Sequence, residues 1–190
     1  MLEESKLWES PVEENTVYRG IIVNVRRDQA QLVDGSITGR EVVEHPGGVA
    51  VFAVDDEERV VMVRQFRYPM GEVLLELPAG KLEPGEDPRA CALRELEEET
   101  GVVPEELWSM GCSYSSPGIF TERIHLYVAR GLRQGIARPD DGEFLTVERI
   151  PLRELLKMIE DNRLPDGKSM VGILKGALFL QRGCGERKGG

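Results

Sequence analysis

The segment from Gly80 to Val102 reads GKLEPGEDPRACALRELEEETGV and decides how the rest of the chain is interpreted. Its second half predicts a helix. Asp87 suits the N-cap, Pro88 suits the first helical position, and Gly101 suits the position after the last turn. Most residues between these signals are good helix formers. A loop containing glycine and proline precedes the helix, so the segment predicts a loop followed by a well-capped helix.

Carboxylates gather on one face of this predicted helix. Glu95, Glu98 and Glu99 follow the spacing i, i+3, i+4, which places them within an arc of roughly 100°. Like charges at this spacing destabilise a helix by a few tenths of a kcal/mol per pair. A solvated acidic face is one explanation. The other is a hard divalent cation, which oxygen ligands bind and which a backbone carbonyl of the preceding loop can help to hold.

Length, charge and composition exclude several classes of protein. The chain has 190 residues and a formal net charge of −10, which argues against general nucleic-acid binding. The longest clear apolar run, Val49–Val54, is far shorter than the roughly 20 residues of a membrane-spanning helix. Residues 1–14 are acidic and polar, unlike a signal peptide. Three cysteines without CxxC spacing indicate reduced thiols, and we therefore expect a cytoplasmic protein without a membrane partner.

Strands are expected on both sides of the predicted helix, which indicates an α/β fold with a mixed sheet and helices on its faces. A break at residues 46–48 predicts a boundary between an N-terminal β segment (1–45) and a main domain (46–190), while residues 1–14 are expected to be a frayed, polar start. The expected strands are 17–25, 30–33, 40–44, 49–54, 59–66, 72–77, 107–113, 124–129 and 143–149. The further expected helices are 152–161 and 169–180, and residues 78–86 are expected to be a loop.

The pattern Gly80-x5-Glu86-x7-Arg94-Glu95-Leu96-x-Glu98-Glu99-x-Gly101-Val102 resembles the Nudix box at every defined position. This resemblance implies a Nudix α/β/α sandwich with a mixed sheet, preceded by a small N-terminal β segment. It also implies a pyrophosphohydrolase that cleaves a nucleoside diphosphate linked to another group. The implied cofactor is Mg²⁺, with Mn²⁺ as a substitute.

Segments outside the box are similar to the ADP-ribose pyrophosphatase branch of this family. They are residues 64–69, 75–80, 115–118 with Pro117, and 140–144. The resemblance implies hydrolysis of ADP-ribose to AMP and ribose 5-phosphate, and a homodimer formed through the N-terminal segment. Another nucleoside diphosphate sugar is the close alternative. A non-catalytic ADP-ribose sensor, dinucleoside polyphosphate cleavage and RNA decapping are further alternatives, the last disfavoured by the net charge.

The resemblance assigns roles to residues of the box. It implies that Glu95 and Glu99, with the backbone carbonyl of Ala79, are the main metal ligands, and that Glu98 serves a further ion. Two metals about 3.5–4 Å apart can activate water and neutralise a diphosphate. Glu86 and Arg94 match positions that support the loop and orient a carboxylate. For Arg94, a structural ion pair is as good an interpretation as a catalytic role.

Outside the box, the resemblance places a general base in a mobile loop over residues 138–143. Glu143 is the first candidate and Asp141 the second, each opposed by the interpretation as an acidic turn; Glu98 is the next candidate if both fail. Arg67 matches a phosphate-binding arginine, although a salt bridge at the rim is an alternative. The remaining expected substrate-binding residues are Pro117, Arg40 and Glu41, the last two also explicable as a pair on a strand edge.

Overall fold

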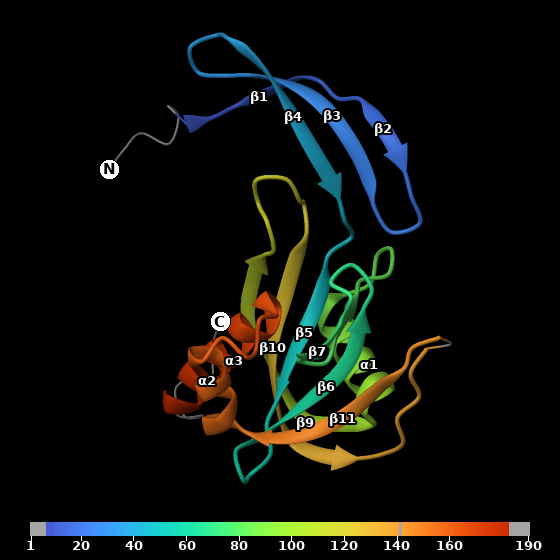
Figure 1. Cartoon of the computed structure of the whole chain (residues 1–190), viewed down its shortest axis with the longest axis vertical. Coiled ribbons are helices and arrows are strands. Elements are labelled where there is room, and N and C mark those ends of the chain that lie inside the picture. The colour runs from blue at the N-terminus through green and yellow to red at the C-terminus, as the bar shows by residue number, and fades with distance from the viewer. Residues whose placement is uncertain (1–6, 141, 183–190) are drawn as a thin grey trace. The chain divides into compact units, whose positions relative to one another are not determined.

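The computed structural model of the protein describes residues 7–140 and 142–182 (Figure 1). The chain divides into two compact units. The first contains the residues up to Gly47 together with Tyr114–Arg123. The second contains Gly48–Ser113 and the residues from Ile124 onward. The chain therefore passes from one unit to the other three times.

The first unit is built on an antiparallel sheet in which one long strand pairs with three others. β3 (Asn24–Gln31) pairs with β4 (Ile37–Glu44), with β1 (Ser10–Glu13) and with β2 (Thr16–Arg19). The prediction of a frayed start is wrong for β1, because its backbone pairs with β3. The prediction of one strand over 17–25 is also wrong, because a turn in which the Gly20 N–H bonds to the Val23 carbonyl (2.9 Å) interrupts it.

Among the residues that the structure describes, the second unit contains two sheets and three helices, which can be followed in Figure 1. One sheet has the order β8-β5-β10-β9, with β5 parallel to β10 and antiparallel to β8, and the other has the antiparallel order β11-β6-β7. The strands are β5 (Gly48–Ala53), β6 (Arg59–Arg67), β7 (Glu72–Glu76), β8 (Ala79–Lys81), β9 (Val102–Tyr114), β10 (Arg123–Gln134) and β11 (Leu145–Pro151). The helices are α1 (Pro88–Thr100), α2 (Leu152–Glu160) and α3 (Gly167–Gln181).

Strand β5 is the centre of the core because both of its faces are covered. On one face, Ala50 and Phe52 belong to a cluster that includes buried residues of α2 and α3. On the other, Val49 and Val51 belong to a cluster that includes the buried side of α1. A continuous apolar run is the pattern of a strand buried on both faces. The mixed sheet between helices confirms the predicted α/β fold with an α/β/α sandwich.

Two local predictions in this unit need correction. The sequence predicts a loop over residues 78–86, but Ala79–Lys81 form the short strand β8 against β5. The strand expected over 143–149 begins later and runs over Leu145–Pro151, paired with β6. Within the described residues, no helix has the length and apolar character needed to cross a membrane.

Candidate active site

Helix α1 is fixed at both ends by the residues that the sequence suggested. The Asp87 carboxylate accepts hydrogen bonds from the N–H groups of Arg89 (3.0 Å) and Ala90 (3.1 Å). Gly101 has a φ of 70°, and its N–H bonds to the Glu97 carbonyl (2.7 Å). Helices commonly end at a residue with this left-handed backbone, and glycine is favoured there because any side chain would be strained. The caps and the buried inner face together set which way the carboxylates of α1 point.

The Glu95 carboxylate lies directly on the backbone of Gly80. A Cβ atom built on Gly80 would lie 1.8 Å from the carboxyl carbon of Glu95, so only glycine allows this approach. The Glu95 side chain is largely buried, at 13% exposure. Burial raises the pKa of Glu95, a tendency opposed by Arg94 and reinforced by Glu98. The box glycine thus serves to bring a carboxylate against the strand that carries the Ala79 carbonyl.

Glu99 is a buried carboxyl beside the same strand. It is only 2% exposed, and its Oε2 accepts a hydrogen bond from the Ala79 N–H (3.0 Å). Burial raises its pKa to about 8, against a lowering by the Ala79 N–H, and the negative charges of Glu95 and Glu143 add to the rise. Without a cation beside it, Glu99 therefore holds a proton at neutral pH.

The raised pKa of Glu99 predicts a pH dependence of stability in the metal-free protein. Between the ordinary value of 4.5 and the folded value of about 8, the folded chain binds more protons than the unfolded chain. Stability from this group is therefore full below pH 4.5 and is lost as the pH rises through 8. We expect Glu99→Gln in excess chelator to melt close to wild type at pH 5 and to exceed its melting temperature by about 10 °C at pH 8.5.

The matched control for this measurement is Glu97→Gln, because Glu97 lies on the exposed side of the same helix. This variant removes the same charge and is expected to change the melting temperature equally at both pH values. A pH-independent difference between wild type and Glu99→Gln would contradict the raised pKa. The readout is differential scanning calorimetry at both pH values.

Arg94 is the counter-charge of the acidic face. Its guanidinium donates to Glu86 (2.9 and 3.0 Å), to Glu95 (2.9 Å) and to Glu98 (2.9 Å). The hydrogen bonds from Arg94 and from the Glu83 N–H lower the pKa of Glu86 to about 2. The four carboxylates are thus not a plain solvated face, since one internal cation binds three of them while Glu99 stays buried.

The oxygen atoms on α1 and β8 are the possible ligands of a metal ion. Within residues 7–140 and 142–182, no three acidic, histidine or cysteine side chains already form a cage for a metal. The available donors are nevertheless carboxylate oxygens on one helix face and the backbone of β8, a set that suits a hard divalent cation. Two of those carboxylates, on Glu95 and Glu98, are bonded to Arg94 in this structure.

The segment that follows β10 is attached to the end of α1. The Gly135 N–H bonds to the Gly101 carbonyl (2.7 Å), and the Arg138 N–H bonds to the Glu98 carbonyl (2.8 Å). Further along, Glu143 is exposed, and its charge contributes to the raised pKa values of Glu95 and Glu99. The structure therefore brings Glu143 within electrostatic reach of the box carboxylates. Asp141, the second candidate for the base, lies outside the described residues.

Arg67, the expected phosphate-binding residue, lies in an ion-pair network that the sequence reasoning missed. Its Nε and Nη2 each donate to the Glu76 carboxylate at 2.7 Å, and Glu76 is only 1% exposed. Lys168 donates to the same carboxylate. The available signal is Glu76 itself, since an acid between the apolar residues Leu75 and Leu77 needs a cationic partner if it is buried.

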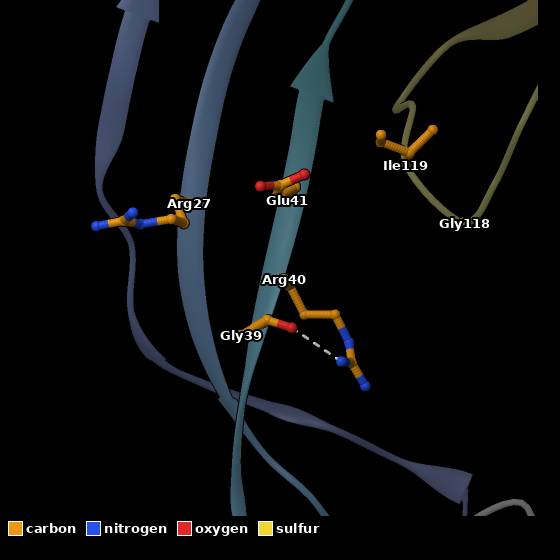
Figure 2. A pocket seen from close by; sticks show the side chains of 6 residues that line it. All are labelled: Arg27, Gly39, Arg40, Glu41, Gly118 and Ile119. Atoms are coloured by element: carbon orange, nitrogen blue, oxygen red, sulfur yellow. Dashed lines mark hydrogen bonds between the residues drawn. The ribbon is translucent and has the colours of Figure 1, made fainter.

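The first unit brings together the other expected substrate-binding residues. Arg40, Glu41 and the loop residues Gly118 and Ile119 line an open pocket of about 500 Å³ (Figure 2). Figure 2 shows Arg40 and Glu41 side by side on β4, with the loop beside them. Pro117 is exposed on that same loop, next to Gly118. This loop is held to β4, because Val43 exchanges backbone hydrogen bonds with Ile119 (2.8 Å) and Thr121 (3.0 Å).

Arg40 is already paired within the first unit. Its Nε and Nη2 donate to the two carboxylate oxygens of Glu9 at 2.9 and 2.6 Å. Its Nη1 donates to the Gly39 carbonyl at 3.0 Å (Figure 2). Bidentate pairing with a carboxylate is the geometry that an arginine also uses for phosphate. Glu9 therefore occupies the edge of Arg40 that an anionic ligand would need.

Helix α1 with its capped ends, the carboxylates against β8 and the α/β/α core define a Nudix hydrolase scaffold. The NUDIX domain profile matches residues 44–170, and the chain belongs to this family. It is 41% identical to the methanol dehydrogenase activator of Bacillus methanolicus, over 87% of this chain and 90% of that protein. It is 38% identical to the ADP-ribose pyrophosphatase of Bacillus subtilis, over 93% and 98%. A solved structure described as an ADP compounds hydrolase shares the fold, with a TM-score of 0.81 at 21% identity and coverage of 93% and 96%.

Proposed function

We propose that the protein hydrolyses the diphosphate of ADP-ribose to AMP and ribose 5-phosphate with the help of Mg²⁺, or of Mn²⁺ as a substitute. The observation that carries this proposal is the acidic face of α1, with Glu95 on Gly80 and Glu99 buried against Ala79. The similarity over nearly the whole length of a relative named for this activity supports the choice of ADP-ribose.

The chain's own residues divide the work as follows. Glu95, Glu98 and Glu99, with the Ala79 carbonyl, would hold the metal ions. Those ions would supply charge neutralisation for the diphosphate and activation of the attacking water. Glu86 anchors Arg94, and Arg94 orients the carboxylates of Glu95 and Glu98 that would hold the metal ions. Arg67 would bind a phosphate oxygen, and Glu143 or Asp141 would accept the proton of the water.

The substrate test is a product assay with a panel of nucleoside diphosphate sugars. At equal concentrations and with excess Mg²⁺, ADP-ribose is expected to give the highest kcat/KM, with AMP and ribose 5-phosphate as products. GDP-mannose and UDP-glucose serve as hexose-linked competitors. A higher kcat/KM for one of these would move the assignment to another nucleoside diphosphate sugar. Binding of ADP-ribose without turnover would identify a sensor instead.

A second candidate function is activation of a methanol dehydrogenase, favoured by the 41% identity to a protein named for that activation. The test adds this chain, and separately its Glu99→Gln variant, to a purified methanol dehydrogenase that is oxidising methanol with its own electron acceptor. Faster methanol oxidation with the wild type, but not with the Glu99→Gln variant, would support the second function and link it to hydrolysis. No acceleration by either protein would reject it.

We also propose that the protein is a cytoplasmic homodimer whose first unit supplies the interface. The sheet of that unit carries exposed apolar side chains, and sheets of few strands are marginal without a covering surface. These side chains include Val12, Val17, Tyr18 and Ile37 on the strands and Ile21 and Ile22 in the turn between β2 and β3, and each is at least 50% exposed. The free thiols of Cys91 and Cys112 support a reducing compartment.

Sedimentation equilibrium at micromolar concentration is expected to give twice the chain mass of 21.3 kDa. Ile21→Glu is expected to weaken the dimer by about tenfold or more, because it places a charge on an apolar surface that becomes buried. Gln31→Glu adds the same charge at an exposed polar position of β3 and is the control. A wild-type monomer with full activity at this concentration would reject the dimer proposal.

A further inference from the structure

An ion-pair network joins the end of β7 to the first turn of α3. The Glu76 carboxylate accepts two hydrogen bonds from Arg67 at 2.7 Å and a third from Lys168. The ammonium group of Lys168 also lies 3.1 Å from both carboxylate oxygens of Asp166. One almost fully buried carboxylate is therefore shared by two cations from different elements.

The first turn of α3 holds Lys168 in this position. Asp166 is the N-cap of α3 and accepts a hydrogen bond from the Ser169 N–H (3.0 Å). Ser169 is fully buried, and its hydroxyl accepts a hydrogen bond from the Leu77 N–H (2.7 Å). Asp166, two positions before Lys168, and Ser169, the residue after it, are thus placed by the fold, and Ser169 is bonded to the residue that follows Glu76. Lys168 is not a surface lysine with a chance partner, since its side chain is only 19% exposed.

The bonds to Glu76 determine which guanidinium nitrogen of Arg67 is left for an anion, and how much positive charge surrounds it. Both bonds to Glu76 use the Nε–Nη2 edge of the guanidinium, which leaves the Nη1 end on a side chain that is 36% exposed. Burial alone would raise the pKa of Glu76, but Arg67 and Lys168 outweigh it and lower the pKa. If Arg67 were the only partner, the charge of the carboxylate would cancel that of the arginine. With Lys168 present, the two cations balance the carboxylates of Glu76 and Asp166, whereas without it the network beside Arg67 would carry a net negative charge.

We propose that Lys168 is a positioning residue for Arg67: it fixes the shared Glu76 carboxylate and keeps the network beside Arg67 from carrying a net negative charge that would oppose a diphosphate. The identity of that diphosphate as ADP-ribose rests on the proposed function. The arrangement predicts an effect on ligand binding that passes through Arg67 and requires no metal ion. It assigns a role to a lysine 101 positions beyond Arg67 in the sequence.

Isothermal titration calorimetry with ADP-ribose in excess chelator tests the proposal. We expect Lys168→Met to weaken binding about tenfold, because removal of one unit charge a few ångströms away changes the local potential by that order. Lys168→Arg keeps the charge and is expected to remain within about threefold of wild type. Lys157→Met makes the same chemical change at an exposed site on α2 and is expected to leave affinity unchanged.

The pathway through Arg67 is tested by combining the changes. In an Arg67→Met background, the added Lys168→Met change is expected to alter affinity by less than about twofold, since the group through which Lys168 acts is gone. An undiminished tenfold effect in that background would overturn the proposal, as would unchanged affinity in Lys168→Met alone. In turnover assays with Mg²⁺, the single change Lys168→Met is expected to raise KM by a larger factor than it lowers kcat.

Two further measurements decide the role of Lys168 if Lys168→Met does not fold or if ADP-ribose is not bound. If Lys168→Met does not fold, as judged by its melting transition, the milder Lys168→Gln replaces it under the same expectations. If wild type binds ADP-ribose but does not hydrolyse it, the proposed activity fails while the calorimetric comparison still decides the role of Lys168. If wild type binds no ADP-ribose, the same titrations with inorganic pyrophosphate decide it, and unchanged affinity among the variants would overturn the proposal.

Discussion

Glu99→Gln is expected to reduce ADP-ribose turnover to roughly a thousandth of wild type or less, the scale of losing one strong electrostatic contribution to a transition state. The amide fits the same cavity but carries no charge for a cation beside Ala79 and Glu95. Wild type in excess chelator is expected to lose activity to the same extent. Steady-state kinetics with Mg²⁺ measures both effects.

Thermal melting separates loss of metal binding from loss of folding. Mg²⁺ is expected to raise the melting temperature of wild type at pH 8, because a ligand that binds only the folded state stabilises it. The Glu99→Gln variant is expected to respond much less, while Glu97→Gln behaves as wild type in both assays. Full turnover by Glu99→Gln, or by wild type without any divalent cation, would refute the metal assignment.

Glu143→Gln is expected to lower kcat by roughly 10²–10⁴-fold, the range for a positioned acid–base group, with a smaller change in KM. A carboxylate whose lone pairs bind a metal is a poor proton acceptor, so a separate carboxylate is required. Glu143 is exposed, yet its charge is felt by Glu95 and Glu99. The neighbouring Gly142, with a φ of 91°, allows a conformation that other residues avoid.

Asp141→Asn is the parallel measurement, because the sequence offers two acids in this loop. If Glu143→Gln retains near wild-type kcat and Asp141→Asn does not, the role passes to Asp141. If both variants keep their activity, the loop does not supply the base, and Glu98 becomes the next candidate. Asp140→Asn makes the same chemical change at the position directly before Asp141. It is the matched control, and little change in kcat is expected.

The parts of the site that the sequence predicts correctly are local ones. Helix α1 begins after Asp87 and ends before Gly101, as expected, because capping depends on residues within a few positions of each other. The i, i+3, i+4 face of Glu95, Glu98 and Glu99 follows from helix geometry alone. Their chemical roles remain proposals that the variants above test.

Interactions between distant segments could not be read from the sequence. Lys168 and Glu76 lie 92 positions apart, and neither has a local pattern that identifies the other. The strand at Ser10–Glu13 looks polar and irregular, because its regularity comes from the backbone of β3 and not from its own side chains. For the same reason, the pairing of β8 with β5 is invisible in a glycine-rich segment that otherwise indicates a loop.

The loop between β9 and β10 has a consequence for the order in which the protein is made. Val43 on β4 hydrogen-bonds to Ile119 and Thr121, so the first unit needs residues that are synthesised only after the whole box. Domains fold as units when all of their chain is available. The amino-terminal strands must therefore wait, incomplete, for the middle of the polypeptide, and a truncated product ending before residue 114 would carry an unfinished first unit.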